Sequence, residues 1–106
     1  MERSRVLITM VVRCRLREGK AEAVEEAIRS LVRSVGSDEP GAVTYGFFRS
    51  RSNPAEVFLI ETYRDEAAAA DHNTSEHMGR FRALFTELFD PTAADLMDSI
   101  AHFTRA

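Results

Sequence analysis

Hydrophobic and polar positions along the chain follow two different periods, and these predict the order of the secondary-structure elements. Residues 5–15, RVLITMVVRCR, are rich in β-branched side chains and predict a strand. Between residues 21 and 35 apolar residues recur at steps of three and four, which predicts an amphipathic helix that ends at Gly36. In the turn that follows, Pro40 fixes one φ angle and Gly41 can adopt a positive φ.

A pair of strands and a second helical region come next. The runs VTYGFFRSR, from residue 43, and VFLIETY, from residue 57, are separated by turn residues and predict a hairpin. Asp65 predicts the cap of a short helix, and Asn73, with Glu76 three residues later, predicts the cap of another. One face of that last helix is apolar and is expected to pack against the core. It consists of Met78, Phe81, Leu84, Phe85 and Leu88.

The end of the chain, residues 94–106, fits neither period well, so the pattern alone decides weakly between helix and strand. Taken as a strand, it completes the order strand, helix, strand, strand, helix, strand. This is the split βαβ order of a ferredoxin-like α+β fold with an antiparallel four-stranded sheet. A chain of 106 residues has room for one such domain, so residues 1–106 are expected to form a single unit.

Both faces of the predicted strands carry apolar residues, although two helices can cover only one face of the sheet. The second face must therefore be covered as well, and in a chain this short another copy of the chain is the simplest cover. We expect a homodimer that packs sheet to sheet.

Composition and charge exclude several classes of function. The net charge is −3 and the arginines are scattered among acids, so no basic stripe would attract nucleic acid. Cys14 is the single cysteine and can form no internal disulfide, and no stretch has the pattern of a signal peptide. The apolar run from Val6 to Val12 is too short to span a bilayer. These features predict a cytoplasmic protein with no membrane or nucleic-acid partner.

Candidate chemistry is concentrated in ETYRDEAAAADHNTSEH, residues 61–77. Histidine is the side chain best suited to proton transfer near neutral pH, so His72 is the candidate base and Glu61 the carboxylate that could orient its ring. His77, in the first turn of a helix, is expected to be neutral and to act as a hydrogen-bond acceptor. A purely structural reading stays open, in which His72 binds a backbone carbonyl and Glu61 pairs with Arg13.

Other side chains suggest a binding pocket and argue against a metal. Tyr45, Phe47, Tyr63 and Phe81 could line a cavity for a flat aromatic ring, and Arg13 could bind an anionic group. His72 and His77 are five residues apart, which on a continuous helix separates them by about 140°. No metal and no cofactor are expected, and His102 is left without a role.

Four stretches together resemble the antibiotic biosynthesis monooxygenase superfamily of dimeric α/β-barrel proteins: VVRCRLREGK (11–20), EPGAVTY (39–45), VFLIETYRDEAAAADH (57–72) and SEH (75–77). The resemblance implies that the end of the chain is a strand. Known members include cofactor-independent monooxygenases of anthrones and quinols, haem-degrading enzymes and an isomerase of a phosphorylated dione. The residues that haem-degrading members use would fall near Val12, His72 and Arg82 and are not retained, so haem is disfavoured.

From this resemblance we expect a cofactor-independent monooxygenase that oxidises a quinol-like or polyphenolic substrate with O₂. The chain has no tryptophan, a residue on which anthrone-oxidising members rely, and its motifs are closer to the quinol monooxygenase and dione isomerase members. Two alternatives stay open. One is an isomerase of a small phosphorylated hydroxy-dione, and the other is a non-enzymatic dimer that binds a small molecule.

Overall fold

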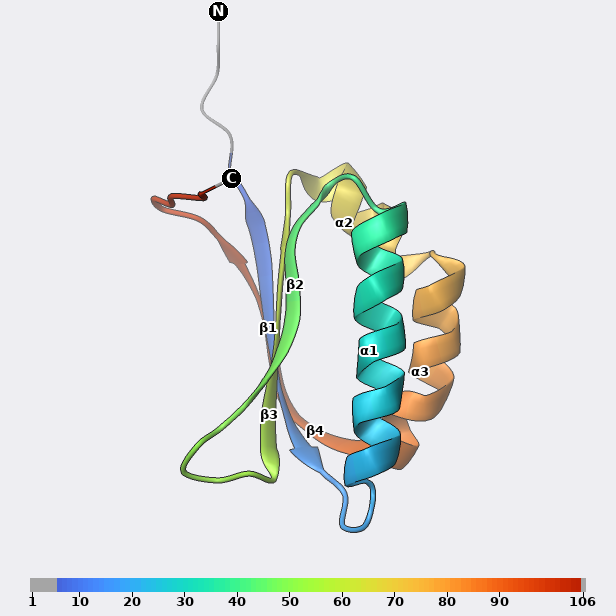
Figure 1. The fold of residues 1–106 in the computed structure, drawn as a ribbon. Coiled ribbons are helices and arrows are strands. Elements are labelled where there is room, and N and C mark those ends of the chain that lie inside the picture. The colour runs from blue at the N-terminus through green and yellow to red at the C-terminus, as the bar shows by residue number, and fades with distance from the viewer. Residues whose placement is uncertain (1–5, 106) are drawn as a thin grey trace, which may run out of the picture.

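The structure is a computed structural model that describes residues 6–105. Its four strands form one antiparallel sheet, and its helices lie against one face of that sheet (Figure 1). In chain order the elements are β1 (Ile8–Leu16), α1 (Ala21–Asp38), β2 (Ala42–Arg49), β3 (Glu56–Tyr63), α2 (Glu66–Asn73), α3 (Glu76–Leu88) and β4 (Phe89–Asp98).

The strands lie in the order β2-β3-β1-β4, which is the ferredoxin-like arrangement expected from the sequence. Residues opposite each other across the sheet share a face, so the register shows which side chains point to the helices. Cys14 pairs with Val57, and both are buried beneath the helices. Val11 pairs with Ile60 on the opposite face, which no helix within residues 6–105 covers (Figure 1).

Two element boundaries differ from the sequence-based prediction. Helix α1 continues through Gly36 to Asp38, because glycine weakens a helix without stopping it. Helix α3 is capped by Ser75, whose hydroxyl accepts a hydrogen bond from the Met78 backbone N–H, whereas Asn73 ends α2. The predicted cap at Asp65 is confirmed, since its carboxylate accepts from the Ala68 N–H.

The segment whose pattern was ambiguous, residues 94–106, begins within a strand, β4. β4 begins at Phe89, directly after α3, and pairs with β1 along its length. Phe89 is fully buried, but β4 leaves the cover of the helices toward its end, where Leu96 is 61% exposed. No helix within residues 6–105 is long and apolar enough to cross a membrane.

The main apolar core lies between the sheet and helices α1 and α3. Its buried members are Cys14, Val24, Leu31, Val35, Val57, Phe81, Leu88 and Phe89. Phe81 and Leu88 of the predicted α3 stripe are buried here, whereas Leu84 is 43% exposed. This core holds the helices against the sheet through dispersion and the burial of apolar surface.

Candidate active site

A cluster of buried polar side chains lies in the same layer, where α1 ends and α2 crosses the sheet. Glu61, His72 and His77 are 5%, 1% and 9% exposed, and the side chain of Glu39 is 9% exposed. They come from β3, α2, α3 and the residue that follows α1. The fold thus gathers four ionisable groups from four segments into one dry place.

Local structure explains why Glu39 reaches this place. It is the residue at which α1 ends, and its backbone N–H bonds to the Val35 carbonyl. The chain then turns tightly against α2, where a side chain at Gly41 would come within 2.5 Å of Ala68 Cβ. Gly41 is needed for this close approach and has no positive φ; among residues 6–105 that conformation occurs only at Gly19.

A break between two helices brings the histidines together. Helix α2 ends at Asn73 and α3 starts at Glu76, and the Ser75 hydroxyl donates to the His72 carbonyl, 2.7 Å away. His72 is in the last turn of one helix and His77 in the first turn of the next. Their separation is therefore not that of a continuous helix, and both rings face the same carboxylate.

Glu39 joins the two imidazoles. Its Oε2 lies 2.9 Å from His72 Nδ1, its Oε1 lies 3.1 Å from the same nitrogen, and His77 Nε2 is also hydrogen-bonded to Oε2. Because an ionised carboxylate can only accept hydrogen bonds, Glu39 favours a proton on each of these nitrogens. In neutral His72 the lone pair is then on Nε2, which points away from Glu39.

Glu61 lies on the other side of the His72 ring. Its Oε1 is 3.7 Å from His72 Nε2 and accepts a hydrogen bond from the Tyr63 hydroxyl. Burial raises the pKa of Glu61, while the Tyr63 hydrogen bond and the charge of His72 act in the opposite direction. The buried groups therefore form two hydrogen-bonded units, Tyr63–Glu61 and His72–Glu39–His77, which face each other where Glu61 Oε1 and His72 Nε2 are 3.7 Å apart.

Two polar atoms in this region have no hydrogen-bond partner within residues 6–105, namely His72 Nε2 and the Tyr45 hydroxyl. The Tyr45 ring lies 5.0 Å from the His72 ring, between centroids. Burial, followed by the charges of Glu61 and Glu39, raises the pKa of Tyr45, so its hydroxyl stays protonated and available as a donor. Unsatisfied buried groups are rare in proteins and often mark a functional site.

A hollow of about 520 Å³ leads from solvent to the cluster. Glu39 and His77 form part of its wall, and His72 lies behind them. Four more acids line the hollow: Asp38, Asp65, Asp71 and Glu76. No lysine or arginine is among the described residues of this wall, so the hollow is strongly acidic.

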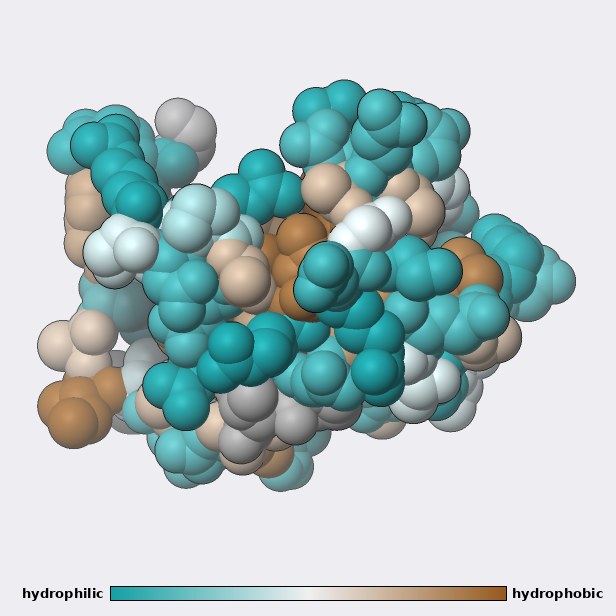
Figure 2. All heavy atoms as spheres, turned by 90° about the horizontal axis from the view of Figure 1, so that it is seen from below, coloured by the Kyte–Doolittle hydropathy of each residue, from teal (hydrophilic) through white to brown (hydrophobic). Residues whose placement is uncertain are grey.

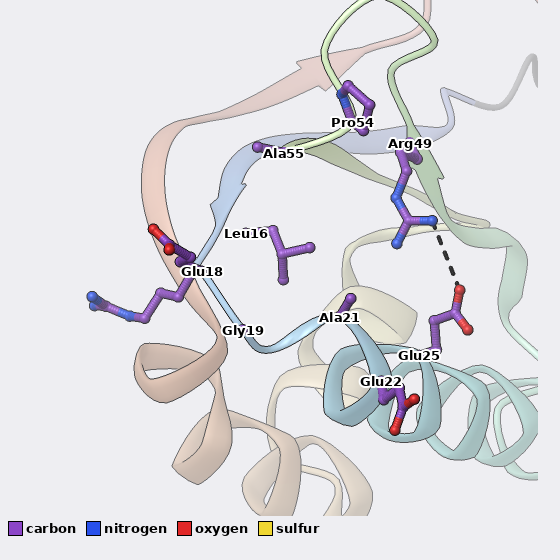
Figure 3. A pocket seen from close by; sticks show the side chains of 10 residues that line it. Leu16, Glu18, Gly19, Ala21, Glu22, Glu25, Arg49, Pro54 and Ala55 are labelled. Atoms are coloured by element: carbon purple, nitrogen blue, oxygen red, sulfur yellow. Dashed lines mark ion pairs between the residues drawn. The ribbon is translucent and has the colours of Figure 1, made fainter.

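A second hollow, of about 450 Å³, lies at the opposite end of α1, beside the β1–α1 turn (Figure 3). Arg49 and Glu25 point toward each other across it and are 3.7 Å apart, and Leu16 lies in its floor. The surface seen from below is mainly hydrophilic with some apolar atoms near its centre (Figure 2). The described residues that line this hollow carry charges of both signs and include no histidine or cysteine, so the acidic hollow is the better candidate for chemistry.

The structure brings most of the predicted site residues together. Glu61, His72 and His77 are in one cluster, and the rings of Tyr45 and Tyr63 lie against His72, with centroids 5.0 and 5.4 Å away. The hydrogen-bond partner of His72 is Glu39, however, and Glu61 is farther away. Sequence reasoning did not single out Glu39, although it begins the stretch EPGAVTY that carried the family resemblance.

The other predicted residues lie elsewhere. Phe47 and Phe81 pack against each other, with centroids 5.8 Å apart, as part of the apolar core. Arg13 alternates with buried Cys14, points to the uncovered face of the sheet and pairs with Glu56 at 3.6 Å. It cannot meet a ligand beside His72, because the sheet separates the two.

Comparison with known proteins places this fold in a family. The sequence model described as antibiotic biosynthesis monooxygenase matches residues 7–84. No match to a curated protein was found.

Solved structures agree over nearly the whole chain. Rv0793 from Mycobacterium tuberculosis has a TM-score of 0.83 and 22% identity, covering 92% of this chain and 99% of its own. Protein SO0527 from Shewanella oneidensis has a TM-score of 0.79 and 26% identity, covering 91% and 93%. A Caulobacter crescentus protein, named as a candidate antibiotic biosynthesis monooxygenase, has a TM-score of 0.80 and 20% identity, covering 93% and 92%.

Proposed function

The chain belongs to the antibiotic biosynthesis monooxygenase family, and we propose that it oxidises a quinol-like or polyphenolic substrate with O₂ without a cofactor. The observation that carries the proposal is the hydrogen-bonded unit Glu39–His72–His77 at the inner end of an accessible hollow. Such a unit can take a proton from a bound substrate, which is the one step that this chemistry requires of the protein.

Proton removal would start at the wall of the hollow. A phenolic O–H placed there meets Glu39 and His77 first, because His72 is only 1% exposed and lies behind them. The proton can be taken by Glu39 or by His77 Nδ1, the ring nitrogen that has no proton when Nε2 donates to Glu39. The His72 N–H, which is bonded to the same carboxylate, would hold Glu39 in place, and Glu61, 3.7 Å from His72 Nε2, would stabilise a positive charge on this ring.

The substrate itself supplies all the electrons. Its anion passes an electron to O₂, the two radicals combine, and the O–O bond then breaks. One oxygen atom remains on the ring and the other leaves as water, so that a quinol and O₂ give a hydroxyquinone and water. The protein contributes the base and an environment with little water, which protects the reactive intermediate.

The acidic hollow argues against the phosphorylated hydroxy-dione as a substrate. Proton shuttling in an isomerase would use the same histidines, but a phosphate group requires nearby cationic groups or backbone N–H donors. Asp38, Asp65, Asp71 and Glu76 would instead repel it. A neutral polyphenol meets no such repulsion when it binds.

Oxygen consumption with a panel of hydroquinones and anthrones tests the proposal. We expect uptake of one O₂ per substrate molecule, and the product should carry one atom of ¹⁸O when the gas is ¹⁸O₂. The variants Glu39→Gln and His77→Gln remove the proton acceptor with little change in shape. They should lower kcat by about 100-fold or more, the usual contribution of a positioned acid or base.

Glu76→Gln is the matched control, because Glu76 lines the same hollow but is exposed and lies outside the hydrogen-bonded unit. Its kcat should equal that of the unaltered protein. If no substrate of the panel is consumed but some bind, the chain is a binding protein. If Glu39→Gln and His77→Gln keep full activity, the assignment of the base is wrong.

We also propose that the protein is a homodimer that packs through the uncovered face of its sheet. Val11, Phe58 and Ile60 lie half-buried on this face, and Phe48 and Met97 on the same face are 47% and 39% exposed. An apolar sheet face open to water is unfavourable, and a second copy offers a surface of the same kind. The Thr9 and Thr62 hydroxyls on this face already bond to each other at 3.0 Å, so they require no further partner.

Sedimentation tests the dimer. Ile60→Glu places a charge in the middle of the uncovered face and should shift the protein from dimer to monomer, because a buried unpaired charge is costly. Glu87→Lys changes an exposed charge on α3 and should leave the dimer intact. A monomeric parent protein at micromolar concentration would contradict the proposal.

A further inference from the structure

We propose that Glu39, His72 and His77 form a binding site for a divalent transition-metal ion of the Zn²⁺ class. The donor atoms would be one carboxylate oxygen of Glu39, His72 Nδ1 and His77 Nε2. This site goes beyond the proposed oxygenase chemistry and does not depend on it.

The donor atoms are already close to the required arrangement. One ligand atom from each of the three residues lies within 4.8 Å of the others, and His72 Nδ1 is 2.9 Å from Glu39 Oε2. An ion bound at about 2.0–2.1 Å in tetrahedral geometry needs donors about 3.3 Å apart. Loss of the protons that now join these atoms and a small adjustment of the side chains would make room for it.

The chemistry of the donors selects the ion. Two imidazole nitrogens and one carboxylate are the ligands of Zn²⁺ and related ions, whereas Ca²⁺ and Mg²⁺ prefer oxygen alone. Three protein ligands also leave a fourth position open, as in catalytic rather than structural zinc sites.

The surrounding groups would support such an ion. A metal on His72 Nδ1 requires the ring proton on Nε2, the buried nitrogen that has no hydrogen-bond partner within residues 6–105. That N–H would point to Glu61, whose Oε1 is 3.7 Å away, and carboxylate–histidine–metal arrangements of this kind are common in metalloproteins. The orphaned nitrogen would then carry a proton that faces a carboxylate, and a small shift of either side chain would bring the two within hydrogen-bond distance.

The hollow gives an ion access to the site, and its charge attracts cations. The hollow of about 520 Å³ opens on Glu39 and His77. Its four other acids, Asp38, Asp65, Asp71 and Glu76, create a negative potential that attracts cations. The same acids oppose an anionic substrate, so a cation is the better match to this part of the surface.

The spacing argument against a metal does not apply to the folded chain. It placed the two histidines on one continuous helix, about 140° apart. They lie instead on α2 and α3, on either side of a break, and both contact Glu39, a residue more than 30 positions earlier in the chain.

Metal binding can be measured without substrate or O₂. The full-length protein is freed of metal with a chelator and titrated with Co²⁺, whose visible absorption reports its ligand geometry, and with Zn²⁺ in a calorimeter. We expect one ion per chain, with intense Co²⁺ bands typical of tetrahedral coordination, and no comparable binding of Mg²⁺. Saturating Zn²⁺ should also raise the melting temperature.

Variants identify the ligands. Glu39→Gln and His77→Gln should each weaken Zn²⁺ binding by more than the roughly 10- to 100-fold effect expected for Glu61→Gln, which removes only the outer partner. His102→Ala is the matched control, because His102 is an exposed histidine outside the cluster, and its affinity should be unchanged.

One measurement needs no variant. In the unaltered protein, bound Co²⁺ should shift the NMR ring signals of two histidines and leave those of the third in place. Absence of saturable binding, or binding that is lost in His102→Ala and kept in His77→Gln, would overturn the proposal. Because a bound ion occupies the atoms that receive the proton, oxygen uptake, if present, should fall when Zn²⁺ is added.

Discussion

The layer between the sheet and the helices is apolar at one end and contains buried ionisable side chains at the other. Toward the start of α1, the layer is hydrocarbon, with Val24, Phe81 and Phe89 at 0–4% exposure. Toward the end of α1, the same layer contains two carboxylates and two imidazoles that are almost as well buried. At the apolar end, burial stabilises the fold because apolar surface is removed from water. At the polar end, each buried donor or acceptor that lacks a hydrogen-bond partner destabilises the fold.

This difference separates stability from chemistry within one small core. The apolar end can hold the helices on the sheet, so the polar end is free to carry groups that contribute little to folding. Such a division is common where a binding site is built into a core, because the scaffold around the site must be rigid. Four experiments test it, two at each end.

The largest effect is expected from Phe81→Ala at the apolar end. Phe81 is 4% exposed and packs against Phe47 and Phe85. Removal of the ring leaves a cavity and should lower the free energy of unfolding by about 3–5 kcal/mol. Denaturant unfolding at fixed protein concentration measures it.

Leu84→Ala is the control for Phe81, since Leu84 is on the same helix but 43% exposed. Its cost should be about 1 kcal/mol or less. Equal losses for the two variants would show that the apolar end is not the main source of stability.

A smaller effect is expected from Glu39→Leu at the polar end. The leucine fills a similar volume but leaves the facing nitrogens of His72 and His77 without an acceptor. A buried donor that loses its partner costs about 1–3 kcal/mol. Glu39→Gln keeps a carbonyl acceptor, so its free energy of unfolding should fall by less than that of Glu39→Leu. A Glu39→Leu variant more stable than both the parent and Glu39→Gln would show that Glu39 does not satisfy these buried donors.

Glu61→Gln should change how stability depends on pH. Burial raises the pKa of Glu61 in the folded protein, so its contribution to stability is complete below the pKa of the unfolded chain. That contribution is lost as pH rises through the folded-state pKa, whereas glutamine does not ionise. The melting temperature of Glu61→Gln minus that of the parent should therefore increase from pH 4 to pH 7.5.

Glu87→Gln is the control for the loss of one negative charge, because Glu87 is exposed on α3. Thermal unfolding of the three proteins across this pH range gives the comparison. A difference for Glu61→Gln that is constant or decreases with pH would show that burial does not raise the pKa of this carboxyl in the folded protein.

The smallest effect concerns Cys14 at the apolar end. Burial raises the pKa of this thiol to about 11, so at pH 8 only about one molecule in a thousand carries the reactive thiolate. Alkylation of the folded protein should be very slow at pH 8 and complete in denaturant. Rapid labelling of the native protein, followed by mass spectrometry, would show that water reaches this end of the core.

Much of the fold could be predicted from the sequence. The period of two in β1, the hairpin of β2 and β3, and the three-to-four spacing in α1 are local patterns, and each was placed to within a few residues. The cap at Asp65 is also a local interaction. Helix ends were less well predicted, since Gly36 and Asn73 are compatible with a boundary but do not enforce one.

The candidate site was predicted only in part, for a physical reason. The sequence by itself determined the order of the elements up to the last segment, the choice of Glu61 and His72 as candidate site residues, and the presence of His77 at the start of a helix. Only the tertiary structure decided that Glu39 joins the two rings and that Arg13 faces away from them. Periodicity fixes the face of an element on which a side chain lies, but contacts between segments 30 or more residues apart depend on how the elements pack, and no local pattern encodes that.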